Sequence, residues 1–498
     1  MLEQELKLSV DGAFAPVFPP GRTGVARVEE RPPVDLRATY YDTSDLRLMR
    51  NGVTLRCRTG DGGSPEWTVK LPAGDAVADG REEVVFEGGT RHVPKSALDM
   101  VRAFARSSDL EPVVRLRTRR RRWLLRDAGG GELAEVVDDR VSVIEHGRIV
   151  ERFRELEIEG RGIERQELER LAGVLEQSGA RRAAQVAKPV RALGDRASAA
   201  PDVPRPEPAR ARDGAAAAVR AAIANGVRRV ILNDPRTRLG EMEPLHQMRV
   251  GTRRLRSDLR TFGPLLDPEW AEALRGELGW LGGSLGAVRD LDVLIDRLRR
   301  EGADLPPRLD GLLAALERRR RRARAALLAD LASPRYVELL DRRVDAAGEP
   351  RLTERARGRA ATILPPLVAR SWRKLARAAH SAGPGSPDEE LHRVRVLAKR
   401  ARYAAEAVAP ALGDDARTRA RSFARRAARV QDVLGELQDS VVAAAAIESY
   451  LAGHPGDASL ALAAGRMLER ESRARSEARA SFPNAWRKLD RPKHRRWM

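Results

Sequence analysis

The sequence predicts an α+β chain of more than one domain, with a β-rich part followed by an all-helical part. The 498 residues exceed the usual size of a single domain. Apolar and polar residues alternate with a period of two up to residue 193, and from residue 215 they repeat with the 3.6 period of helices. Between them, residues 194–214 hold four prolines, which favour an extended linker. We therefore expect domains over 1–193 and 215–498.

Composition narrows the class of protein. Hydrophobic residues make up 42% and charged residues 33% of the chain, and no apolar run approaches the about 18 residues that span a bilayer. The acidic start, Met1 to Glu5, lacks the basic and apolar pattern of an export signal, so we expect a cytoplasmic protein with no membrane partner. The single cysteine, Cys57, excludes an internal disulfide and a cysteine-based metal site. Only carboxylates and histidines remain as metal ligands.

Positive charge is concentrated in the second part of the chain. Residues 1–200 carry 34 Lys and Arg against 33 Asp and Glu, a net charge of +1. The whole chain carries 92 and 72, so the other 298 residues hold 58 and 39, a net charge of +19. This excess of positive charge indicates a polyanionic partner, either nucleic acid or polyphosphate. A general enrichment of arginine in the proteome would produce the same excess.

The β-rich part holds seven runs that alternate apolar and polar residues between Gly, Pro and Asp turns. They are LEQELKL (2–8), VTLRCR (53–58), EWTVKLP (66–72), REEVVFEG (81–88), VVRLRTRRRRWLL (113–125), ELAEVVDD (132–139) and RELEIEG (154–160). Residues 163–179 instead place leucines at helical spacing. We expect an antiparallel sheet with minor helices.

Several of these strands combine an apolar face with an ionic one. Because alternate side chains share a face, Glu3, Glu5 and Lys7 point together, away from Leu6 and Leu8. The late strand does the same with three glutamates. One such strand is usually just a solvated sheet face. Repeated over four strands and turned inward, these faces would hold hard divalent cations and a substrate with several negative charges.

In order along the chain, these motifs resemble the CYTH family, the triphosphate tunnel metalloenzymes. The motifs are Glu3-x-Glu5-x-Lys7, Tyr41-Asp42-Thr43, Leu55-Arg56-x-Arg58, Trp67-x-x-Lys70-Leu71-Pro72, Arg81-x-Glu83, Glu155-x-Glu157-x-Glu159 and Lys188-Pro189. The resemblance implies an eight-stranded antiparallel tunnel that binds a triphosphate with Mg²⁺ or Mn²⁺. It also implies catalysis at a phosphoanhydride bond.

The resemblance also implies roles for individual residues. Metal ligands would be Glu3, Glu5, Glu157, Glu159 and Asp139, with Asp138 as the alternative to Asp139; the phosphate clamp would be Lys7, Arg56, Arg58, Lys70, Arg117, Arg119 and Lys188. Glu3, Glu5, Lys7 and Lys70 would be the catalytic set. The register of Arg115 to Arg122 is ambiguous, and Cys57 should face away from the tunnel.

We expect hydrolysis of inorganic triphosphate, because metal and arginines supply the charge neutralisation that phosphoryl transfer needs. Thiamine triphosphate, nucleoside triphosphates and cyclisation of ATP remain alternatives. A scaffold that binds phosphate polymers without catalysis is another.

The helical part contains an internal repeat. LHQMRVGTRRLRSDL from Leu245 aligns with LHRVRVLAKRARYAA from Leu391, and LGAVRDLDV from Leu285 aligns with LGELQDSVV from Leu434. Two matches in the same order indicate a duplication. We expect copies near 215–350 and 351–498.

Each copy places cations along one side of a helix. A helical wheel sets His246, Arg249, Arg253 and Arg256 in one sector, opposite apolar residues, and we call these four the first stripe. The second stripe is His392, Arg395, Lys399 and Arg402. Cations repel a metal ion, so the stripes indicate anion binding. Aromatic residues are only 4% of the chain, which disfavours nucleic acid because few rings are present to stack on bases.

These residues resemble the CHAD family, the conserved-histidine α-helical domain. The resemblance implies two four-helix bundles, binding of inorganic polyphosphate and association with polyphosphate granules. It implies that the polyphosphate ligands are His246, Arg249, Arg253, Arg254, Arg256, His392, Arg395, Lys399, Arg400 and Arg402. We expect Asp290 and Asp439 to orient the arginines through salt bridges.

Overall fold

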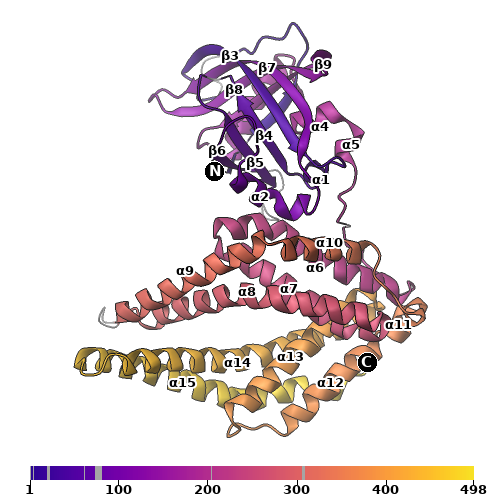
Figure 1. Cartoon of the computed structure of the whole chain (residues 1–498), viewed down its shortest axis with the longest axis vertical. Coiled ribbons are helices and arrows are strands. Elements are labelled where there is room, and N and C mark those ends of the chain that lie inside the picture. The colour runs from indigo at the N-terminus through magenta and orange to yellow at the C-terminus, as the bar shows by residue number, and fades with distance from the viewer. Residues whose placement is uncertain are drawn as a thin grey trace. The chain divides into compact units, whose positions relative to one another are not determined.

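The computed structural model describes residues 2–3, 5–18, 23–60, 62–72, 81–184, 186–203, 205–304 and 309–498, without the side chains of Leu2, Glu3 and Arg81. The chain divides into two compact units, Met1–Asp202 and Val203–Met498 (Figure 1). The division falls inside the segment predicted to be a linker. No helix of the described residues is long and apolar enough to cross a membrane.

The N-terminal unit is built on one antiparallel sheet that closes on itself. The described strands are β1 (Leu2–Glu3), β2 (Glu5–Ser9), β3 (Arg27–Asp42), β4 (Thr54–Thr59), β5 (Glu66–Pro72), β6 (Arg81–Glu87), β7 (Glu111–Arg126), β8 (Glu132–Glu145), β9 (Arg148–Gly160) and β10 (Arg181–Arg182). Their order is β1-β6-β5-β4-β3-β7-β8-β9-β2-β10. Since β1 and β2 flank Gln4 and pair with β6 and β9, one stretch of chain joins the two ends of the sheet.

Counting β1 and β2 as one strand and leaving out the two-residue β10, the ten segments make eight strands. The predicted antiparallel tunnel is confirmed. The long strand β3 was missed by the sequence analysis, because Pro32 and Pro33 interrupt its alternation. In the structure the pairing of β3 with β7 shifts register between Arg31 and Val34, which accommodates these prolines.

The described residues of this unit also form the helices α1 (Arg47–Arg50), α2 (Lys95–Ala105), α3 (Arg165–Gln177), α4 (Lys188–Leu193) and α5 (Asp195–Ser198). Helix α3 is the helix expected over 163–179, and its Leu168, Leu171 and Leu175 pack against Leu6 and Ile158 on the outer face of the sheet. Burying these apolar side chains stabilises this side of the barrel.

The inward faces of β7, β8 and β9 change character along their length. Leu116, Val143 and Phe153 belong to one apolar cluster, which Ala197 of α5 joins. On the same strand faces, further along, stand charged residues such as Arg120 and Glu157. The tunnel therefore has an apolar end and an ionic end.

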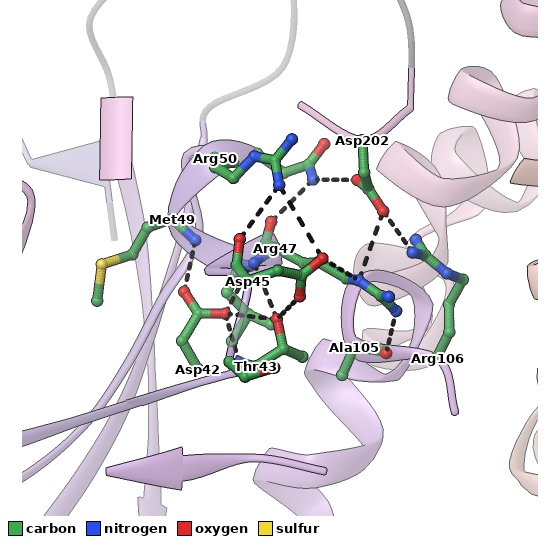
Figure 2. A network of polar contacts seen from close by, with 12 residues as sticks. Asp42, Thr43, Asp45, Arg47, Met49, Arg50, Ala105, Arg106 and Asp202 are labelled. Carbon is green, nitrogen blue, oxygen red and sulfur yellow. Dashed lines mark hydrogen bonds and ion pairs between the residues drawn. The ribbon is translucent and has the colours of Figure 1, made fainter. Parts of the chain in front are cut away.

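A polar network fastens the last residues of this unit to α1 and α2 (Figure 2). Asp42 accepts backbone hydrogen bonds from Thr43, Leu48 and Met49; burial raises the pKa of Asp42 to about 6, against the effect of these hydrogen bonds. Asp202 accepts hydrogen bonds from Arg106 and Asn51. Residues 194–202 thus belong to the N-terminal unit, and the extended linker predicted from Gly194 starts too early.

The C-terminal unit is helical throughout its described residues. Its long helices are α6 (Ala215–Leu239), α7 (Met242–Thr261), α8 (Pro268–Glu301), α9 (Asp310–Ala332), α10 (Pro334–Gly348), α12 (Pro365–His380), α13 (Asp388–Val408), α14 (Asp414–Ala452) and α15 (Ala458–Leu489), with a short α11 (Ala360–Ile363). Helices α6 to α9 pack in sequence, as do α12 to α15, which confirms the duplicated four-helix arrangement.

The two copies pack against one another. Helix α7 contacts α13, and α8 contacts α14. One apolar cluster combines Leu298 and Leu312 of the first copy with Ile447 and Met467 of the second. The buried Arg297 donates hydrogen bonds of 2.7 to 3.0 Å to Glu471, which joins α8 to α15. The copies therefore share a core and form one unit.

Candidate functional sites

The ionic end of the barrel encloses a cavity of about 260 Å³. The charged residues that line it are Glu5, Lys7, Arg56, Arg58, Lys70, Glu83, Arg120, Arg122, Glu135, Glu157, Glu159, Arg161 and Lys188. They come from β2, β4 to β9 and α4, except Arg161, which directly follows β9. Strand alternation turns the intervening residues the other way, and Cys57 between two cavity arginines is buried on the opposite face, as expected. Burial raises the pKa of its thiol.

Three carboxylates gather on neighbouring strands. Oxygen atoms of Glu5, Glu157 and Glu159 lie within 4.8 Å of one another, because Glu5 of β2 pairs with Glu159 of β9 and Glu157 is two residues away. Such oxygen ligands suit hard divalent cations such as Mg²⁺ and Mn²⁺. The predicted ligand Glu3 lies in β1 opposite Arg81, but the side chain of Glu3 is not among those that the structure describes.

Two lysines neutralise the carboxylates beside this cluster. Buried Lys7 donates hydrogen bonds to Glu155 and Glu157. Lys188 Nζ lies 2.8 Å from Glu157 and 3.0 Å from Asp139. Burial alone would raise the pKa of Glu157, but Lys188 and Lys7 hold it well below its usual range. For Lys188 the two effects have the opposite signs. Burial alone would lower its pKa, but the facing carboxylates raise that pKa well above the ordinary value. Glu157 is therefore ionised before any metal binds.

The structure places Asp139, rather than Asp138, on the inner face of β8. Asp139 is 0% exposed and accepts two hydrogen bonds from Arg120, at 2.9 and 2.7 Å. Asp138 points the other way and pairs with Arg154. Asp139 stands outside the three-carboxylate cluster, so its contacts assign it to holding Arg120 and Lys188 in place.

The predicted clamp cations of β4 and β5 all reach the cavity. Arg58 donates a 2.9 Å hydrogen bond to Glu66, and Lys70 pairs with Glu83. Arg56 lies 3.9 and 3.8 Å from the same two glutamates. These carboxylates hold the three cations in place along the cavity wall.

Strand β7 contributes different arginines from the expected pair. Arg117 and Arg119 are exposed on the outer face and do not line the cavity. Arg120 and Arg122 line it instead. The buried Leu116 and Thr118 share the face of Arg120, and this apolar alternation was the signal that could have set the register. Sequence reasoning also missed Glu135 and Arg161, a facing pair at the rim.

In the C-terminal unit, cations of both copies come together where α7 meets α13. Burial lowers the pKa of Lys399 to about 8, and Arg253, Arg395 and Arg249 lower it further by repulsion. These residues belong to both stripes, so the stripes share one surface. Glycines at equivalent positions of the two copies lie beside the stripes: a Cβ on Gly286 would lie 3.6 Å from Arg249, and one on Gly435 would lie 3.6 Å from Arg395, both ordinary contact distances.

Side chains behind the stripes orient them. Asp290 accepts a 2.6 Å hydrogen bond from Arg249, as expected. Burial raises the pKa of Asp439, with Arg395 opposing this shift. His392 Nδ1 lies 2.6 Å from Oε1 of Gln438. The equivalent residue of the first copy, His246, has a pKa that is lowered by burial and by the nearby Arg289.

The remaining predicted ligands fall into two groups. Arg254 and Arg402 both pair with Glu406, at 2.9 and 3.4 Å. Arg256 and Arg400 join a second gathering of cations: burial lowers the pKa of Arg260 to about 10, and Arg400, Arg275 and Arg256 contribute by repulsion. Arg253 donates hydrogen bonds of 3.1 and 2.8 Å to the Tyr403 hydroxyl.

Comparison with known families agrees with both sites. Residues 1–184 match the CYTH domain and residues 221–448 match the CHAD domain. The chain belongs to both families. A Mycobacterium tuberculosis H37Rv protein named "Uncharacterized protein Rv2226" is 33% identical over 524 residues, spanning 98% of this chain and 96% of its own. CYTH tunnel enzymes are metal-dependent and bind triphosphate substrates, and the acidic cluster of this CYTH domain offers metal ligands.

Two solved structures resemble parts of the chain. The structure titled "PptA from Streptomyces chartreusis" has 25% identity and a TM-score of 0.45, and the match covers 55% of this chain and 98% of that one. The CHAD domain from the plant Ricinus communis has 26% identity and a TM-score of 0.46, with 57% and 96% covered.

Proposed function

We propose that the CYTH tunnel hydrolyses inorganic triphosphate in a metal-dependent reaction. The observation that carries this proposal is the meeting of three carboxylates with a wall of arginines and lysines in one cavity. A carboxylate cluster alone would serve as a metal site, and cations alone would serve as an anion site. Together they suit a substrate that carries its negative charge on successive phosphoryl groups.

Glu5, Glu157 and Glu159 would hold Mg²⁺ or Mn²⁺, which supplies charge neutralisation on phosphate oxygens. Arg56, Arg58 and Lys70 would bind oxygens from one side of the tunnel, and Arg120 and Arg122 would bind them from the β7 side. Fixing the chain in this way supports in-line attack by water on the terminal phosphorus. Lys7 and Lys188 keep Glu157 ionised, so that the charge of the site is balanced before the substrate arrives.

The test is phosphate release by the full-length protein with Mg²⁺ or Mn²⁺ from triphosphate, ATP, thiamine triphosphate and long polyphosphate. Glu5→Gln/Glu159→Gln should lower turnover of triphosphate by about 100-fold or more, because two of three charged ligands are lost. Glu151→Gln, on an exposed part of the same strand β9, is the matched control and should leave turnover unchanged.

Three results would contradict the proposal or favour another function. Full activity in the double variant would refute the assignment of the metal ligands. Formation of a cyclic nucleotide from ATP without phosphate release would favour a cyclase. No turnover with any substrate, together with retained polyphosphate binding, would favour a scaffold.

We further propose that the CHAD unit binds inorganic polyphosphate on the surface shared by the two stripes. Its support is the convergence of cations from two copies of the same motif on one surface. A phosphate chain needs charge and no stacking partner, and Tyr403 is the one aromatic residue among the described stripe segments. Arg249→Gln/Arg395→Gln should weaken polyphosphate binding by at least about tenfold. Such a protein would associate with polyphosphate granules in the cytoplasm, which microscopy of a tagged chain would test.

A further inference from the structure

A separate group of cations surrounds a pocket between α14 and α15. The pocket has a volume of about 160 Å³ and is lined by Ser422, Arg425, Arg426, Arg429, Ala485 and Lys488. The four α14 residues are spaced i, i+3, i+4 and i+7, so they lie on one side of that helix. Neither stripe contributes to the pocket, because the stripes lie on α7 and α13.

The cations of this pocket lack the acidic partners that other arginines of α14 have. Arg417 pairs with Asp414 and Arg419 with Asp415, at 2.6 and 3.7 Å. Within the described part of the chain, no carboxylate forms an ion pair with the three pocket arginines or with Lys488. The nearby Asp490 is already engaged by His380 and Arg495.

The residues next to the pocket are also basic and include a buried histidine. His494 is 7% exposed, and its Nε2 has no hydrogen-bond partner among the described residues. Burial lowers the pKa of His494, and the positive charges of Arg426, Lys493 and Arg491 contribute. The Nε of Arg426 is also buried without a partner in the described structure. Arg425, Arg429 and Lys488 are exposed, so an anion from outside the chain can reach them and would offset the repulsion among these groups.

We propose that this pocket is a second binding site for phosphoryl anions, distinct from the surface of the stripes. Three guanidinium groups and an ammonium suit an anion with several charges and several acceptor oxygens, and the hydroxyl of Ser422 adds a donor. The pocket is smaller than the tunnel cavity of about 260 Å³, so a ligand the size of pyrophosphate fits it better than a longer segment. The same chemistry is offered by free pyrophosphate and by the end of a polyphosphate chain. This site depends neither on catalysis in the tunnel nor on polyphosphate binding by the stripes.

The experiment is isothermal titration calorimetry of the full-length protein with inorganic pyrophosphate, and separately with long polyphosphate, in the absence of metal. Arg425→Gln/Arg429→Gln is the test variant. Arg417→Gln/Arg419→Gln is the matched control, since it removes the same charge from the same helix at arginines that already have partners. Arg249→Gln/Arg395→Gln reports on the stripes.

The test variant should lose one pyrophosphate-binding event or bind it about tenfold more weakly, while the control and the stripe variants keep it. If the test variant loses binding of pyrophosphate but not of long polyphosphate, the ligand is the free anion. If it loses binding of both probes, the site also binds the end of a polyphosphate chain. Unchanged binding in the test variant would overturn the proposal, as would an equal loss in the control, which would show an effect of net charge.

Lys488→Gln, on the other helix, provides a second variant should the double substitution disturb α14. It should weaken the same binding event. A circular dichroism spectrum and a melting temperature for each variant show whether the fold is kept. If Lys488→Gln and the double variant both fold and both bind pyrophosphate as the parent chain does, the site does not exist.

Discussion

Lys399 stands among cations from both copies of the CHAD domain, and its pKa is lowered to about 8 by burial first and by those cations second. In the unfolded chain a lysine titrates near its ordinary value, about 10.4. The folded state therefore binds fewer protons between these pH values. The destabilisation from Lys399 is fully present below about pH 8 and disappears as the pH rises through this window.

We predict that polyphosphate binding takes up protons at this residue. A bound anion would offset the repulsion that lowers the pKa of Lys399, so at pH 8.5 to 9 binding should be accompanied by uptake of up to about one proton. Calorimetric titrations in buffers of different ionisation enthalpy measure this number. Lys399→Met should abolish the uptake. Equal uptake in that variant, or none in the parent chain, would show that the anion binds away from Lys399.

The choice between neighbouring residues was the part of the site that the sequence left open. Asp138 and Asp139 have the same chemistry, and only the pairing of Asp139 with Arg120 and Lys188 distinguishes them. The shared inward face of Glu5 and Lys7, and that of Glu157 and Glu159, could be predicted because strand alternation determines it. Contacts between side chains of distant strands could not.

At the scale of elements, the turn after β4 depends on a glycine. Gly60 has a φ of +112°, and a Cβ built on it would lie 2.1 Å from the carbonyl oxygen of Asp35 in β3. Neither a rotamer change nor a side-chain movement relieves a contact with backbone. Strand β4 carries Arg56 and Arg58, so this close approach of β3 and β4 also positions part of the clamp.

We predict that Gly60→Ala destabilises the N-terminal unit by about 2 to 4 kcal/mol, because the clash adds to the strain of a positive φ. Gly62→Ala is the control: Gly62 also has a positive φ, +81°, but no atom lies within 4 Å of its Cβ position. It should cost about 1 kcal/mol. Scanning calorimetry compares the two. Similar costs would mean that β3 moves aside at little expense.

Element types were largely predictable, while registers were not. Alternation identified most strands, and the 3.6 period together with the duplicated motifs identified the helical copies. In the run Arg115 to Arg122, however, six of the eight residues are cations, so only Leu116 and Thr118 indicate which side faces inward. The register of β7 is set by burial of Leu116 against the apolar end of the tunnel, which is a tertiary contact.

For the whole molecule, the two units differ in net charge, and the ligands proposed for them are related. Almost all the net positive charge lies after residue 200, whereas the first 200 residues are balanced at +1. A nearly neutral tunnel domain attracts a polyanion weakly at long range, and a strongly basic CHAD domain attracts it well. With polyphosphate bound as proposed, joining the two domains in one chain would raise the local concentration of phosphate polymers available to the tunnel.

This reasoning gives a prediction that separates capture from catalysis. The variant Arg249→Gln/Arg395→Gln/Lys399→Gln should raise the KM for long polyphosphate by about tenfold or more, because the chain is no longer held by the stripes. Its kcat and KM for triphosphate should not change, since a short anion reaches the tunnel without help. Steady-state phosphate release with both substrates measures these constants.

Salt provides the internal check on this prediction. High ionic strength screens the basic surface, so the parent chain at about 1 M salt should lose its advantage on long polyphosphate and approach the variant. Arg417→Gln/Arg419→Gln, with the same kind of charge removed outside the stripes, should behave like the parent chain at low salt. If the triple variant lowers turnover of triphosphate and polyphosphate equally, the stripes support the tunnel's own activity, and local capture is not their role.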